Sequence, residues 1–146
     1  MSAFLFSSDA EIHRIGERLA ARTLPKAEWT HAAHFAAALW LIRCRPELDA
    51  ANVMPGMIRA YNEATGGINS DTAGYHETIT QASLRAARAH HDRFAPESPI
   101  FVVANALLAS PLGDKEWPLA YWSRVLLFSV EARRAWVAPD LQELPF

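Results

Sequence analysis

The segment from Thr30 to Arg45 constrains the fold most, because it is apolar over most of its length and is followed at once by Pro46. At 100° per residue, one sector about 120° wide holds six of its side chains, namely His31, His34, Phe35, Ala38, Leu41 and Ile42. This pattern predicts a helix that ends before the proline and turns the sector toward the core. Two histidines on that inward face would need hydrogen-bond partners or a ligand.

Spacing and end signals predict further helices, namely one that starts at Ser8 and ends before Pro25, then Val53–Thr65, Gly74 or Tyr75 to Phe94, and Pro118–Trp136. Ser8 and Glu11 have the spacing of a capping box. Residues 100–109 are apolar except for Asn105, which fits a strand or a buried helix, and the lack of a partner strand favours the helix. We therefore expect residues 1–146 to form one all-α, bundle-like domain of five or six helices.

The last predicted helix is apolar on more than one side. One stripe consists of Tyr121, Val125, Phe128, Ala132 and Trp136, and other apolar residues widen it. Such a helix lies at the centre of a bundle or covers a second subunit. A homodimer through this helix is therefore a predicted assembly.

Composition restricts the class of protein further. The chain is 51% hydrophobic and 21% charged, which argues against disorder, and its net charge of −2 disfavours nucleic acid as a partner. The single cysteine, Cys44, excludes an intramolecular disulfide and a CxxC metal site. Residues 1–9 lack the basic start of a signal peptide, and no apolar run is long enough to span a membrane. We expect a soluble, cytoplasmic protein.

A second histidine segment, Tyr75-His76-Glu77-Thr78, lies at the start of the fourth predicted helix. His76, Thr80 and Ser83 form a polar stripe on the face of that helix expected to be buried, which a solvated pocket or a ligand would explain. His31, His34 and His76 would together supply three nitrogens to a divalent transition metal such as Zn, Ni or Fe. We predict that these three imidazoles lie within about 8 Å of one another.

Two carboxylates are candidates for catalysis beside such a metal. Glu77 or Asp71 would complete the ligand set, or accept a proton from a metal-bound water. Each also has a purely structural explanation. Glu77 suits the first turn of a helix, and Asp71 suits a turn or a cap. His31 equally suits a helix start at which it bonds a nearby carbonyl.

Hydrogen-bonding side chains gather around the second histidine segment. Those predicted to bind a small polar molecule are Tyr61, Asn62, Asn69, Tyr75 and Thr80. For Asn69 the structural alternative is turn formation.

Two resemblances rest on these segments. Trp29-Thr30-His31-x-x-His34 and Gly74-Tyr75-His76-Glu77-Thr78, with Tyr121-Trp122-Ser123 and Ala138-Pro139-Asp140-Leu141, resemble a family of small bacterial proteins of unassigned function. Glu28-Trp29-Thr30 followed by His34 also resembles the second helix of DinB/YfiT-like proteins. That resemblance implies a metal-binding four-helix bundle related to thiol-dependent transferases and hydrolases. Its later HxxxH motif would match His76 to Thr80, where threonine replaces the second histidine, so His34 and His76 carry over.

Three function classes follow. The first is a metal-dependent enzyme of the hydrolase or transferase type that acts on a small polar substrate. The second is a metal-free protein that binds a small ligand, and the third is a helical interaction module that dimerises. No nucleophile motif, phosphate loop or dinucleotide fingerprint is present in the sequence.

Overall fold

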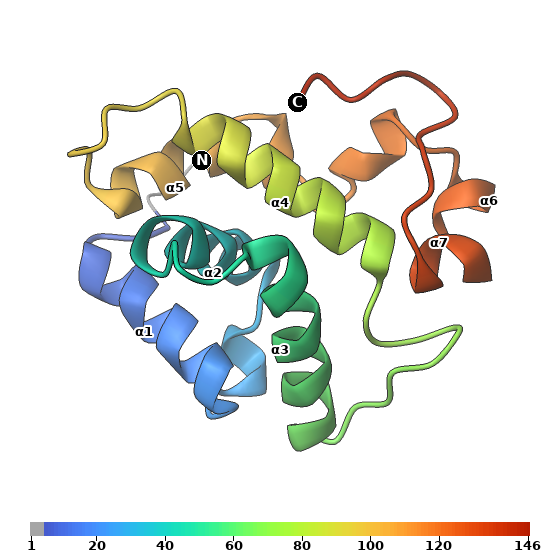
Figure 1. Ribbon diagram of the computed structural model, residues 1–146, viewed down its shortest axis with the longest axis horizontal. Coiled ribbons are helices and arrows are strands. Elements are labelled where there is room, and N and C mark those ends of the chain that lie inside the picture. The colour runs from blue at the N-terminus through green and yellow to red at the C-terminus, as the bar shows by residue number, and fades with distance from the viewer. Residues whose placement is uncertain (1–4) are drawn as a thin grey trace.

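A computed structural model describes residues 5–146, in which every regular element is a helix (Figure 1). The α-helices are α1 Asp9–Ala21, α2 His31–Cys44, α3 Ala50–Ala64, α4 Glu77–His91, α5 Ile100–Ala109, α6 Arg124–Leu127 and α7 Val130–Arg134. The predicted all-α class is confirmed, with five longer helices and two short ones. Residues 100–109 form a helix, as expected, and no strand occurs in residues 5–146.

Helix α2 lies at the centre of the fold and packs against α1, α3, α4 and α5. It begins where predicted, because the Oγ1 of Thr30 accepts a hydrogen bond from the amide of Ala33. Its buried surface is wider than the predicted sector and includes every residue from Phe35 to Ile42. Close packing depends on Gly16 of α1, where an added Cβ would lie 2.1 Å from the Trp40 ring.

A hydrogen bond connects α3 and α4 beside a proline within α3. Helix α3 begins at Ala50 rather than at the predicted Val53, so Pro55 lies in its second turn. A start at Val53 would have placed this proline in the first turn, where it is tolerated. Proline has no N–H to donate to the carbonyl of Ala51 one turn earlier. The side-chain amide of Gln81, on α4, donates to that carbonyl instead, at 2.9 Å. The missing helix bond is thereby replaced by a contact between helices.

Phe6, which precedes α1, is hydrogen-bonded to α5. The backbone amide of Phe6 donates to the side-chain oxygen of Asn105, and the side-chain amide of Asn105 donates back to the Phe6 carbonyl. The predicted capping box is wrong in one half, because Ser8 caps α1 without a side-chain hydrogen bond. Ser7 bonds Glu11 instead, through its amide and its hydroxyl. The expectation that residues 1–9 are not a signal peptide concerns a segment of which residues 1–4 lie outside the described residues.

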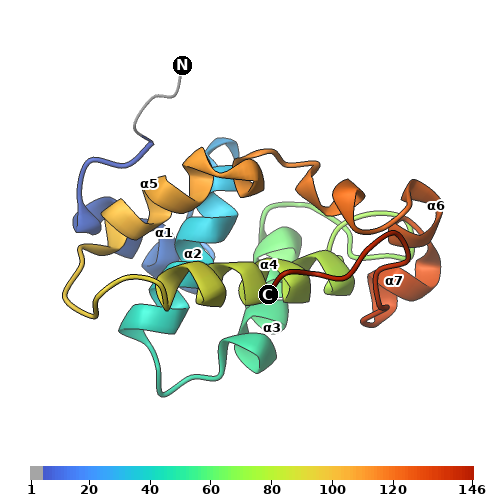
Figure 2. The same ribbon diagram turned by 90° about the horizontal axis from the view of Figure 1, so that it is seen from above.

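The prediction of one continuous helix over Pro118–Trp136 is wrong. The structure has a 3₁₀ turn at Trp117–Ala120, then α6 and α7, at the end of the molecule where α4 begins (Figures 1 and 2). The Ser123 hydroxyl accepts a hydrogen bond from the Leu126 amide, and the Ser129 hydroxyl accepts one from the Ala132 amide. Each serine is therefore the N-cap of a new helix, α6 or α7.

The split also redirects the apolar side chains of this region. Val125 is 87% exposed and Phe128 50% exposed, whereas Trp122 is fully buried. The predicted homodimer therefore stays a prediction, and the long helix expected to form it is not present. Among residues 5–146, no helix combines the length and apolar character needed to cross a bilayer.

Candidate functional site

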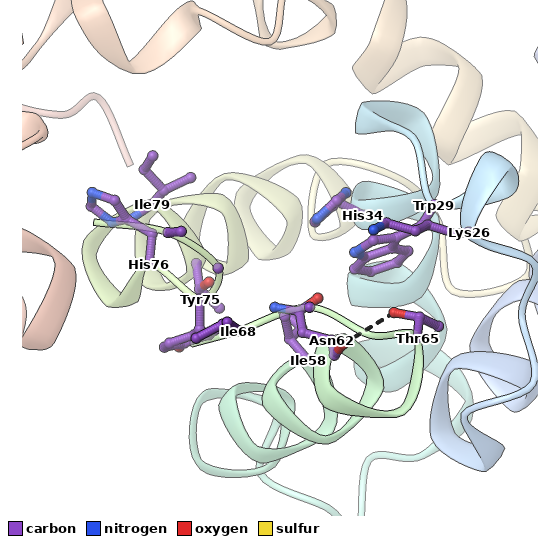
Figure 3. Close-up of a pocket in the computed structure, with 14 residues that line it drawn as sticks. Lys26, Trp29, His34, Ile58, Asn62, Thr65, Ile68, Tyr75, His76 and Ile79 are labelled. Carbon is purple, nitrogen blue, oxygen red and sulfur yellow. Dashed lines mark hydrogen bonds between the residues drawn. The ribbon is translucent and has the colours of Figure 1, made fainter. Parts of the chain in front are cut away.

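A pocket of about 420 Å³ lies between the start of α2, the end of α3, the following loop and the first turn of α4 (Figure 3). Most of its lining surface is apolar, although about half of the lining residues carry polar groups. The residues that matter most for its chemistry are Trp29, His34, Ile58, Asn62, Ile79 and Thr80.

His34 is the most unusual group in the pocket. Its ring stacks on Trp29 at a centroid distance of 3.7 Å, and its Nδ1 lies 2.7 Å from the Thr30 carbonyl oxygen. Because a carbonyl only accepts, Nδ1 carries the proton and Nε2 keeps a lone pair. Desolvation by the surrounding protein lowers the pKa of His34 to about 4, although part of the ring faces the pocket. His34 is therefore neutral at pH 7.

His76 lines the other end of the pocket but is held by the protein. Its Nε2 donates to the Leu127 carbonyl at 2.7 Å, and its Nδ1 accepts from the Ile79 amide at 3.2 Å. The histidine is thus the N-cap of α4 and also ties α4 to α6. Burial, and then the nearby Arg133, lower the pKa of His76, which favours the neutral form that this cap requires.

We expect His76→Ala to reduce the free energy of unfolding by about 2 kcal/mol, because it removes a helix cap and leaves the buried Leu127 carbonyl unpaired. His76→Asn should restore part of this stability, because asparagine is also a good cap. Urea unfolding at pH 7.5 measures both. Equal stability of the alanine variant and the wild type would contradict a role of His76 in capping α4 and holding it to α6.

The structure does not bring the three predicted metal ligands together. His31 donates from Nε2 to the Leu112 carbonyl at 2.8 Å and does not line the pocket, so its structural alternative holds. His34 and His76 lie at opposite ends of the pocket (Figure 3), and both ring nitrogens of His76 are engaged. Within residues 5–146, no three His, Cys, Asp or Glu side chains are arranged to hold an ion. The residues present therefore do not fit a three-histidine centre for Zn, Ni or Fe.

The two predicted catalytic carboxylates are also separate from His34. Glu77 is the first residue of α4 and accepts hydrogen bonds from the Tyr75 hydroxyl and from Gln81. Asp71 forms an ion pair with Arg134. Neither carboxylate lines the pocket.

Three of the five predicted ligand-binding residues, Asn62, Tyr75 and Thr80, line the pocket. Tyr61 is fully buried and donates its hydroxyl to the Leu24 carbonyl. Asn69 organises the loop instead, because its side-chain oxygen accepts from the Tyr75 amide and from the Asn62 side chain. The same loop needs glycine at Gly74, which has φ +82° and lies too close to the Ile68 carbonyl for a Cβ.

Four further residues that the sequence did not indicate line the pocket, namely Lys26, Trp29, Ile58 and Ile79. Ile79 lies three residues after His76 and thus on the same helical face, which is a signal that could have identified it. Trp29 adjoins the Thr30 cap, but only the fold shows that its ring covers His34. Lys26 has no sequence signal that distinguishes it from Lys115, the one other lysine of the chain, which is also exposed.

The fold and the pocket define a small all-α protein with a mainly apolar, histidine-containing pocket. Comparisons with protein-family models, with curated protein sequences and with solved structures find no match to this chain. Both resemblances stay predictions.

Proposed function

We propose that this protein binds a small organic molecule that has an apolar body and one hydrogen-bond donor. The observation that carries this proposal is the Nε2 of His34, an acceptor with no hydrogen-bond partner within residues 5–146, beside a mainly apolar pocket. An acceptor in such surroundings gains most from a ligand that donates to it and excludes water.

The other walls support the same ligand class. Ile58, Ile79 and the ring of Trp29 offer apolar surface, whose removal from water is the main favourable contribution to binding an apolar body. Asn62 and Thr80 add polar groups that would orient the ligand. The volume of about 420 Å³ suits a molecule of one or two rings.

Binding is favoured over a reaction by the composition of the pocket. Its lining contains no carboxylate and no thiol, and the two candidate catalytic carboxylates are engaged elsewhere. With its pKa lowered to about 4, His34 is a weak base, well suited to accept a hydrogen bond without taking the proton. An enzymatic role stays a prediction from the sequence.

Phenol and anisole form a matched pair of probes, because both have one ring and only phenol has an O–H donor. We expect phenol to bind about tenfold more tightly, since only phenol can donate to the acceptor of His34 at the pocket wall. Titration followed by amide chemical shifts should place the changes at Trp29, His34, Asn62 and Thr80.

His34→Phe should abolish the preference for phenol, because phenylalanine keeps a ring but has no acceptor. The control is His90→Phe, near the end of α4, which does not line the pocket and should leave the preference unchanged. Equal affinity of the wild type for both probes, or shift changes elsewhere in the molecule, would rule out the proposed role of His34.

A further inference from the structure

A second hollow of about 310 Å³ lies between α3, the loop before α4 and α7. We name it the arginine cleft, and it is lined by Arg59, Asn69, Ser70, Asp71, Tyr75, Arg133 and Arg134. Tyr75 also lines the pocket described above, so the two sites share one side chain and otherwise have different walls.

One arginine of the cleft is already neutralised. Arg134 donates from Nε and Nη2 to the two oxygens of Asp71, at 2.8 and 2.7 Å. This bidentate contact holds the pKa of Asp71 below its ordinary value, so the carboxylate is ionised at neutral pH. Asp71 is the only carboxylate among the lining residues.

The other two arginines are positioned but not neutralised. The guanidinium of Arg59 lies over the Tyr75 ring, 4.6 Å from its centroid. Arg133 donates from Nη1 to the Gly74 and Tyr75 carbonyls, at 3.0 and 3.2 Å. Neither arginine forms an ion pair with a carboxylate within residues 5–146. Contacts with uncharged groups therefore hold both guanidiniums in place and leave their charges available.

The charge of the cleft selects a ligand class. Three guanidiniums and one carboxylate leave a net charge of +2 on the lining residues. Glu63, which accepts from Asn69, and Glu131 are outside the lining. A doubly charged oxyanion matches this charge better than a monoanion does, and guanidinium groups bind such oxygens through paired hydrogen bonds.

We propose that the arginine cleft binds the phosphate group of a small soluble phosphate monoester. Arg59 and Arg133 donate to its oxygens, and the exposed hydroxyl of Ser70 adds a further donor. This site does not depend on the ligand proposed for the pocket that contains His34.

Titrations of the full chain with inorganic phosphate, sulfate and acetate at pH 8 and constant ionic strength test this assignment. We expect saturable binding of phosphate and sulfate at one site, with shift changes at Arg59, Ser70 and Arg133, and acetate at least tenfold weaker. Glycerol phosphate should bind as inorganic phosphate does. Binding only to vesicles that contain phosphatidic acid would overturn the assignment to a soluble ligand, and absence of saturable binding would overturn the site.

Three variants separate recognition from structure. Arg59→Gln should weaken phosphate binding about tenfold, because a charge-assisted contact is lost. The matched control is Arg85→Gln, since Arg85 also lies over an aromatic ring, that of Trp136, but outside the cleft. Asp71→Asn should strengthen binding about fivefold, because it removes the one opposing charge and frees Arg134. Equal effects of the two arginine variants, or weaker binding by the asparagine variant, would overturn the proposal.

Discussion

Trp122→Ala is expected to reduce the free energy of unfolding by about 3–5 kcal/mol, the largest effect predicted for a single side chain of this protein. Trp122 is fully buried, meets Trp136 edge to face at 5.7 Å, and donates from its indole nitrogen to the Val137 carbonyl at 3.0 Å. The variant loses the packing of a large side chain and leaves the partly buried Val137 carbonyl without this donor. The melting temperature should fall by on the order of 10 °C, which calorimetry measures.

Val125→Ala is the control for this prediction. Val125 is 87% exposed, so its truncation should change stability by less than about 0.5 kcal/mol. In one continuous helix from Pro118 to Trp136, Val125 would belong to the apolar stripe and its loss would be costly. Similar losses for Trp122→Ala and Val125→Ala would therefore contradict the division of this region into α6 and α7.

Acidification from pH 7.5 to pH 4.5 is expected to destabilise the protein by about 2–3 kcal/mol through His34 alone. In the unfolded chain this histidine takes up a proton near its ordinary pKa of 6.5, whereas in the folded protein it does so only at about 4. Between these values the unfolded state binds more protons, so stability decreases as pH falls. Burial lowers the pKa of His76 and His90 as well, which acts in the same direction.

Urea unfolding of the wild type and of His34→Phe at both pH values isolates this contribution. The variant loses the hydrogen bond to Thr30 at every pH, so only the difference between the two pH values is informative. We expect that difference to be about 2–3 kcal/mol smaller in His34→Phe, because phenylalanine does not titrate. The same pH dependence in both proteins would show that His34 titrates normally in the folded state.

The sequence predicts the long helices well because their signals are local. Thr30 caps α2 and Pro46 follows its end, and both signals act through neighbouring residues. The C-terminal region fails because two local signals compete there. Its apolar spacing indicates one helix, while the hydroxyls of Ser123 and Ser129 offer caps that start new ones. Spacing alone does not reveal which signal prevails.

The sequence also locates the pocket better than it explains it. His76 is buried, as expected, and both His34 and His76 line the pocket, whereas His31 does not. Their hydrogen-bond partners cannot be predicted, because they are backbone carbonyls, and every residue of the chain has one. The carbonyl that pairs with His76 belongs to Leu127, 51 positions away, and that of His31 to Leu112, 81 positions away. When such carbonyl partners are not known, several histidines expected on inward faces suggest a metal site.

The central position of α2 has a consequence for the protein during its own synthesis. Two of the helices that cover α2 are α4 and α5, and α5 ends about 65 residues after α2. At translation rates of about 5–20 residues per second, roughly 3–13 s separate the appearance of the two helices. Throughout that interval the nascent chain carries an apolar helix with an incomplete cover. The burial of α2 can therefore be completed only after α5 has been synthesised.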